Sequence, residues 1–175
     1  MSTVTTLERT IEIFKNDPSV PNLHATALKK YKIFCSNRTV NLYTTFFKLI
    51  GEEDLSWCSE ATYKSSFRAN VPFPGKANER NVSGGVTSSQ RLQGIVRYEY
   101  KGNIVEECRK DGKIHGLRVV CTQMGHIWLR LYKDNQRLAQ VVLNADLSEQ
   151  SSIDEGGLKI VKENLHIIRS CFATE

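Results

Sequence analysis

A row of aromatic and basic side chains near the middle of the chain is the clearest candidate for binding chemistry. The segment Trp128–Lys133 alternates aliphatic residues with aromatic and basic ones. In a strand, alternate residues share a face, so Trp128, Arg130 and Tyr132 would stand together on one face. Such a row can stack against planar groups or attract anions. It can equally pack beneath a helix or against a neighbouring strand.

Residue patterns for catalysis or metal binding are weak. The chain has four histidines and five cysteines, without a C-x-x-C pair or an HExxH motif. We therefore assign no catalytic residue, no metal ligand and no cofactor. An enzyme with a cysteine–histidine site is an alternative, and it predicts an exposed thiol of low pKa beside a histidine. Glu106 and Glu107 are not a carboxylate pair, because neighbours in a strand point to opposite faces.

The candidate row lies inside a repeat of about 23 residues. Residues Gly102–Thr122 align with Gly125–Ala145, and a fainter copy aligns Arg91–Gly94 with Lys113–Gly116. Self-similarity at a fixed period indicates a repeated supersecondary unit. Runs rich in β-branched residues flank a turn signal in each copy, so we expect each unit to be a β-hairpin.

The expected turns fall at Asp111-Gly112 and Asp134-Asn135. Tight hairpin turns need positive φ at both central residues, which Gly, Asn and Asp adopt most readily. Strands and turns then alternate roughly every ten or eleven residues, as they do in an antiparallel meander. The expected strands are Leu92–Tyr100, Ile104–Arg109, Ile114–Thr122, His126–Tyr132 and Leu138–Asn144.

The best copy, Val105–Gly116, resembles the MORN repeat, in which a strand is followed by Lys-Asn/Asp-Gly-Lys and then His-Gly. The matching residues are Lys110, Asp111, Gly112, Lys113, His115 and Gly116. The second copy matches well only at Tyr132, Lys133 and Asp134, and both copies lack the leading Tyr-x-Gly. The resemblance covers about 55 of the 175 residues. It implies a scaffold that mediates protein assembly, often at membranes or the cytoskeleton, and sometimes contacts anionic phospholipid.

Helical spacing predicts helices at both ends of the chain. A capping box at Thr5 begins the first helix, and Pro18 stops it. A second helix is expected from near Pro21-Asn22. The segment Asn37–Ile50 favours a helix by spacing, although its composition would also suit a strand. A last amphipathic helix is expected to begin at a capping box over Ser152–Glu155 and to lay its apolar stripe on the sheet. The stripe continues to Phe172.

These elements predict an α+β fold. We expect a helical N-terminal part over residues 1–70 and a Pro/Gly-rich loop over residues 71–89, with an edge hairpin turning at Ser83–Gly85 as an alternative to the loop. Residues 90–175 would form an antiparallel meander of about five strands with MORN-like hairpins, closed by the C-terminal amphipathic helix. The whole is expected to be one compact unit.

Composition narrows the class of protein. Odd, scattered cysteines argue for free thiols in a reducing, cytoplasmic compartment. We expect no transmembrane segment, because no apolar run is long enough. The net charge is +5, and residues 61–150 hold 14 basic and 8 acidic residues, so the basic excess lies on the expected sheet.

We therefore expect a non-enzymatic binding or scaffold protein that uses its sheet surface. The expected partner is a protein, with an anionic phospholipid surface as a second candidate. A nucleic-acid-binding sheet is a further alternative, which the small charge surplus disfavours. The candidate contacts are Lys110, Lys113, Arg130, Lys133 and Arg137 for anions and Trp128 and Tyr132 for apolar groups.

Overall fold

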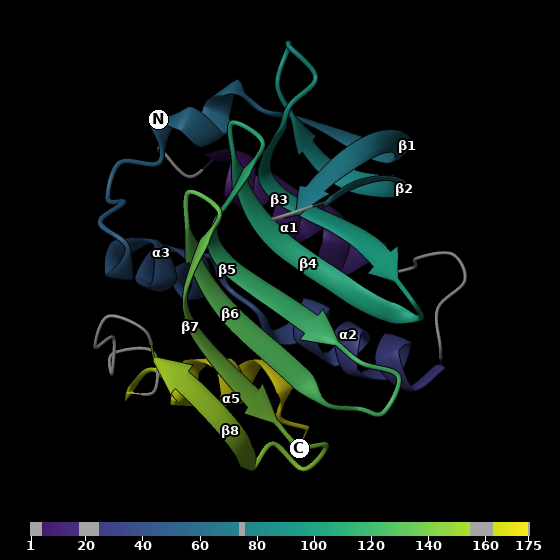
Figure 1. Ribbon diagram of the computed structural model, residues 1–175, viewed down its shortest axis with the longest axis vertical. Helices are drawn as coiled ribbons and strands as arrows, with labels where there is room; N and C mark the ends of the chain where they lie inside the picture. Colours follow the sequence, from purple (N-terminus) through teal and green to yellow (C-terminus); the bar gives the residue numbers. More distant parts are fainter. Residues whose placement is uncertain (1–4, 18–24, 74–75, 155–162, 175) are drawn as a thin grey trace.

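The computed structural model describes residues 5–17, 25–73, 76–154 and 163–174. Its centre is an eight-stranded antiparallel sheet in which every strand pairs with its neighbours in sequence. The helices lie behind this sheet in Figure 1, so the protein is α+β. The strands are β1 (Thr62–Phe73), β2 (Lys76–Val86), β3 (Leu92–Tyr100), β4 (Asn103–Lys110), β5 (Lys113–Cys121), β6 (Ile127–Lys133), β7 (Gln136–Leu143) and β8 (Glu149–Asp154).

The five predicted strands are confirmed as β3 to β7, with ends shifted by two residues at most. Both predicted turns are present. Asp111 and Gly112 have φ of 52° and 83°, and Asp134 and Asn135 have φ of 46° and 72°. Positive φ at both central residues matches the right-handed twist of the flanking strands, which is why these turns join a meander.

The predicted division of the first 89 residues is wrong after residue 61. Residues 62–73 and 76–86 form the strands β1 and β2 instead of helix and loop, and the last pair of this hairpin is Phe73 with Lys76, so it does not turn at Ser83–Gly85. The sequence did not predict these strands, because two prolines and a polar composition are typical of a loop. Pro72 is tolerated because β1 is an edge strand, where a missing N–H breaks no pairing with a further neighbour.

The helices follow the predicted spacing more closely. The helical elements are α1 (Thr5–Asn16), α2 (Ala25–Asn37), α3 (Val40–Leu49), the short 3-10 helix η1 (Ser56–Glu60) and α5 (Leu165–Phe172). The predicted start of the second helix lies outside the described residues. The helix over 40–49 is confirmed, and it excludes a strand there.

The predicted start of the C-terminal helix is wrong at Ser152. This residue lies in β8, which pairs with β7 through Val141. The strand was missed because Glu149–Asp154 is a polar edge segment without clear alternation. The helix itself is confirmed over residues 165–172, and residues 155–162 lie outside the described part of the chain.

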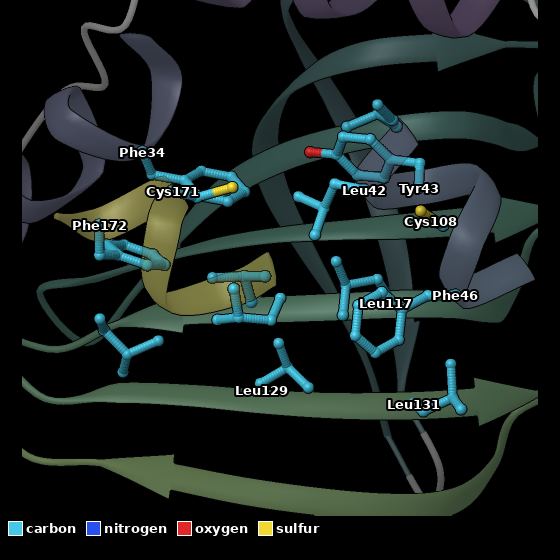
Figure 2. Packing of buried hydrophobic residues seen from close by; sticks show 14 of the residues in the cluster. Phe34, Leu42, Tyr43, Phe46, Cys108, Leu117, Leu129, Leu131, Cys171 and Phe172 are labelled. Atoms are coloured by element: carbon cyan, nitrogen blue, oxygen red, sulfur yellow. The ribbon is translucent and has the colours of Figure 1, made fainter. Parts of the chain in front are cut away.

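One hydrophobic core fills the space between the helices and the sheet (Figure 2). Leu117, Leu129 and Leu131 point from the sheet toward the helices, and all three are at most 2% exposed. The C-terminal helix closes this core through Phe172, whose ring stacks on Phe34 of α2 at 5.0 Å. The described part of its apolar stripe is therefore buried in this core, as predicted, although the helix packs chiefly against α2 and not directly on the sheet.

The opposite face of the sheet carries the β1–β2 hairpin instead of helices. β2 pairs with β3 only from Val82 to Val86, and the other end of the hairpin folds across the front of the sheet in Figure 1. Two features permit the bend. The register of β1 shifts next to Ser66, whose φ is 44°. A Cβ on Gly84 would lie 2.4 Å from the carbonyl oxygen of Ile95, so only glycine allows β2 to approach β3 so closely here.

Among the described residues, no helix combines the length and the apolar character needed to cross a bilayer.

Candidate functional site

A second apolar cluster lies on the helix-free face of the sheet, beneath the hairpin. Val71 and Val82 come from the hairpin, and Val96, Val105 and Val120 come from β3, β4 and β5. All five side chains are buried. Because valines of the two layers meet, the hairpin is packed onto the sheet and forms a second layer on it.

A cavity of about 400 Å³ remains between the hairpin and the sheet. The hairpin contributes Val71, Asn78 and Arg80 to its lining. The sheet contributes Tyr98, Tyr100, Asn103, Val105, Arg118, Val120, Thr122, Trp128 and Arg130. The walls thus combine apolar and aromatic surface with three guanidinium groups, and none of these lining residues is acidic.

Two of the three arginines are held against aromatic rings. The guanidinium of Arg80 lies 4.7 Å from the ring centre of Tyr100, and that of Arg130 lies 5.3 Å from the ring centre of Trp128. Arg130 also donates from Nε to the side-chain oxygen of Gln140 at 2.7 Å. Cation–π contact orients a guanidinium without neutralising it. Both groups can therefore still bind an anion.

The third arginine belongs to a buried ionic network around Glu107. Arg109 approaches one carboxylate oxygen with Nη2 at 2.7 Å, and Arg118 approaches the other with Nε at 3.6 Å. The hydroxyl of Tyr98 donates to the same carboxylate. Two arginines therefore share one buried carboxylate, and this carboxylate contacts Tyr98 and Arg118, which line the cavity.

The pKa shifts around the cavity reflect burial and charge crowding. Burial, the largest single influence, lowers the pKa of Arg118, but Glu107 together with Tyr98 and Tyr132 raises that pKa overall. Burial lowers the pKa of Arg130, and the nearby positive charge of Arg118 lowers it further. An anion placed between such groups would relieve this crowding.

The same network fixes the outer wall of the cavity. Arg109 is fully buried and donates from Nη1 to the carbonyl oxygens of Pro72 at 2.7 Å and Gly112 at 2.8 Å. Pro72 lies near the tip of the hairpin and Gly112 in the β4–β5 turn. One guanidinium therefore joins the hairpin to the sheet.

The adjacent carboxylate serves the other face of the sheet, as the alternation predicted. Glu106 points toward the helices, where it accepts hydrogen bonds from Arg38, from the hydroxyl of Tyr31 at 2.9 Å and from that of Tyr43 at 2.5 Å. These donors come from α2, the α2–α3 connection and α3. Glu106 thus joins the helices to the sheet through buried hydrogen bonds.

The structure divides the predicted contact residues into two groups. Trp128 and Arg130 line the cavity, which agrees with the face that alternation assigned to them. Tyr132 shares that face but is buried at 3% exposure, so it offers little contact surface. Arg137 reaches the same side chain of Gln140 that Arg130 contacts, at 3.3 Å, and lies outside the lining.

The three predicted lysines lie elsewhere, at the edge formed by the β4–β5 and β6–β7 turns. Lys113 and Lys133 are exposed at the ends of their strands. Lys110 pairs with Glu52 at 2.7 Å and borders a separate cavity of about 470 Å³ that also contains acidic Glu60. The lysines and the cavity arginines therefore do not form one site.

Arg80, Tyr98, Tyr100 and Arg118 are site residues that the prediction missed. Alternation along the predicted strands could have placed Tyr98, Tyr100 and Arg118 on the face of Trp128, since their registers follow from the turns. Arg80 had no such signal, because the composition of residues 71–89 predicts a loop and not a strand.

The cysteines are all buried and free. Burial raises the pKa of Cys35 and Cys171 to about 11 and that of Cys58 to about 12, which is opposite to the shift that activates a nucleophilic thiol. His115 accepts the N–H of Asp134 at Nδ1 (3.1 Å) and faces Glu52 at Nε2 (3.0 Å). Its ring therefore has partners on both nitrogens. No group of ligands suited to a metal ion occurs among the described residues.

In comparisons with protein-family models, curated proteins and solved structures, the chain finds no match. The resemblance to MORN repeats stays a prediction.

Proposed function

We propose that this protein is a non-enzymatic binding module that holds anionic partners on the helix-free face of its sheet. One observation carries the proposal: the described residues that line the cavity on that face include three arginines and three aromatic residues, and none of them is acidic. A planar guanidinium matches carboxylate and phosphate groups in geometry as well as charge. The surface is therefore complementary to an anion attached to an apolar group.

Binding fits the lining better than catalysis does. Among the described residues, the lining contains no cysteine, histidine, aspartate, glutamate or lysine. These residue types supply most general bases and activated nucleophiles near neutral pH. Arginine, asparagine and valine instead orient and enclose a bound group.

The partner that we propose first is an anionic phospholipid surface. Arginines beside aromatic rings suit a membrane interface, where a charged headgroup adjoins apolar chains. The MORN resemblance, with its implied role in assembly at membranes, supports the same partner. We place the protein in a reducing cytoplasmic compartment as part of this proposal, which its five free cysteines support.

The test compares binding to vesicles of phosphatidylcholine alone with binding to vesicles that also contain phosphatidylserine. We expect co-sedimentation only with the second kind, and a weaker effect at high salt because exposed charges are screened. The double variant Arg80→Gln/Arg130→Gln should lose most of this binding. Arg68→Gln is the matched control, because Arg68 lies on the same hairpin but pairs with Glu79 in solvent.

A second variant reverses the charge of Lys110, Lys113 and Lys133. If this variant loses binding while the arginine variant keeps it, the lysine edge is the contact surface and the proposal for the cavity face is wrong. Absence of binding to both vesicle types, together with specific capture of a protein that depends on Arg80 and Arg130, would replace the lipid by a protein partner.

A further inference from the structure

We infer that the cavity beneath the β1–β2 hairpin binds one small amphipathic organic acid, with its carboxylate or phosphate at the arginines and its apolar body against the valines and aromatic rings. This inference rests on the proposed function for the sign of the ligand's charge. It goes further in naming a single enclosed molecule, where the proposed function requires only contact with an anionic surface.

The size of the cavity favours a single small molecule. Its volume of about 400 Å³ lies in the lower part of the range of small-molecule sites. At ~30 Å³ for each water-sized group, it accommodates about 13 such groups. A flat contact with a macromolecule would need no such hollow.

The walls of the cavity are built from two layers. Val71 on the hairpin and Val105 and Val120 on the sheet belong to one buried cluster, and each of the three also lines the cavity. The partly buried Trp128 packs against this cluster. An apolar ligand body enclosed here would be removed from water by both layers, which a ligand on an open sheet would not be.

Charge in the cavity requires a ligand with an acidic group. Arg80 contacts the ring of Tyr100, and Arg130 contacts a ring and the amide oxygen of Gln140. These neighbours leave the positive charge of both guanidinium groups in place. Asn78 and Asn103 also line the cavity and add amide groups that can bind the remaining oxygen atoms of the ligand.

The outer wall is already in position. The hydrogen bond from buried Arg109 to the carbonyl oxygen of Pro72 holds the hairpin over the sheet, and Glu107 in turn pairs with Arg109. A ligand therefore need not order the hairpin when it binds, which reduces the entropic cost of binding.

The first experiment uses isothermal titration of the full chain with naphthalene-2-carboxylate and decanoate, two acids of about the right size. We expect saturable binding of at least one acid with one molecule per chain. Naphthalene-2-carboxamide and decanamide keep the apolar body but not the charge. They should bind at least about ten-fold more weakly than the acids, because charge-assisted hydrogen bonds are stronger than neutral ones. Equal binding of acid and amide would overturn the inference.

The second experiment separates the enclosed site from general attraction to anions. Val120→Phe fills the cavity without removing a charge, so it should abolish binding of the acids while leaving attraction to anionic vesicles intact. Arg130→Gln should weaken binding of the acids by about ten-fold or more, and Arg68→Gln should not. Urea unfolding of each variant verifies that it is folded.

The outcomes distinguish the two proposals. If Val120→Phe binds the acids as the wild type does, or if no acid binds while anionic vesicles do, the enclosed site is wrong and the proposed function stands. If neither acids nor vesicles bind, both are wrong. Decanoate is also supplied within phosphatidylcholine vesicles. If the protein binds decanoate only from solution, the ligand is a soluble acid; if it also extracts decanoate from vesicles, the ligand can come from a membrane. Either result supports a site for a single molecule.

Discussion

Replacing Glu107 by glutamine removes one negative charge from the network that joins the hairpin to the sheet and changes little else in shape. Glu107 and Arg109 have fully buried side chains, and that of Arg118 is 9% exposed. The amide oxygen of glutamine can still accept the hydroxyl hydrogen of Tyr98. The substitution therefore isolates the effect of the charge on two arginines that share it.

The magnitude follows from burial. Removing one partner of a buried ion pair leaves an uncompensated charge in a poorly polarisable environment, which costs about 3–5 kcal/mol. We expect Glu107→Gln to lower the free energy of unfolding by about 3 kcal/mol, at the low end, because one hydrogen bond is kept. For a chain of this length, this corresponds to a fall in Tm of roughly 10 °C.

The matched control is Glu79→Gln on the hairpin. Glu79 also pairs with an arginine, Arg68, but both side chains are 58% exposed. Exposed pairs contribute about 0–1 kcal/mol, so this variant should unfold at nearly the wild-type urea concentration. Urea unfolding followed by circular dichroism gives both values. Equal, small losses in the two variants would refute the reasoning that burial makes the Glu107 network essential.

Two further predictions concern other buried groups. Gly116→Ala should lower the free energy of unfolding by about 2–4 kcal/mol, because φ is 110° and the added Cβ would lie 2.7 Å from the ring of Phe47. Gly94→Ala is the control, since Gly94 also has positive φ but has open space for a Cβ. It should lower the free energy of unfolding by only about 1 kcal/mol, and urea unfolding measures both variants. Stability should also fall above pH 9, because burial raises the pKa of Cys35 to about 11 and that of Cys58 to about 12. Above pH 9 these thiols lose their protons on unfolding, since the unfolded chain has the lower pKa. Each thiol should therefore lower the free energy of unfolding by roughly 1.4 kcal/mol at pH 10. Alanine at either cysteine should reduce this loss between pH 8 and 10, and an unchanged loss would contradict the assignment.

The middle of the fold was predictable because local chemistry specifies it. Asp111-Gly112 and Asp134-Asn135 adopt the positive φ that a two-residue turn requires, and the turns then set the register of the strands between them. Alternation placed Trp128 and Arg130 on the face that now lines the cavity. The turn residues and the alternation are both local patterns, formed by residues close together in the chain, so a single sequence is enough to predict them.

The hairpin and the cavity were not predictable in the same way. The bend depends on Gly84, which allows β2 to approach β3, and on Ser66, which has positive φ without being glycine. The contact that holds the bend joins Arg109 to the backbone of Pro72, 37 residues away. A backbone carbonyl has no residue type, so no sequence pattern indicates such a contact.

Glu106 and Glu107 are adjacent in β4 but join different layers to the sheet, namely the helices on one face and the β1–β2 hairpin on the other. The carboxylate of Glu106 binds donors on the helical side, and that of Glu107 binds Arg109, which holds the hairpin. The helices and the hairpin over the cavity are therefore joined to the sheet by two separate networks of hydrogen bonds and ion pairs. It follows that loss of Glu106 should loosen the helices while leaving the lining of the cavity in place. Loss of Arg109 should release the outer wall of the cavity, although Arg109 itself does not line it.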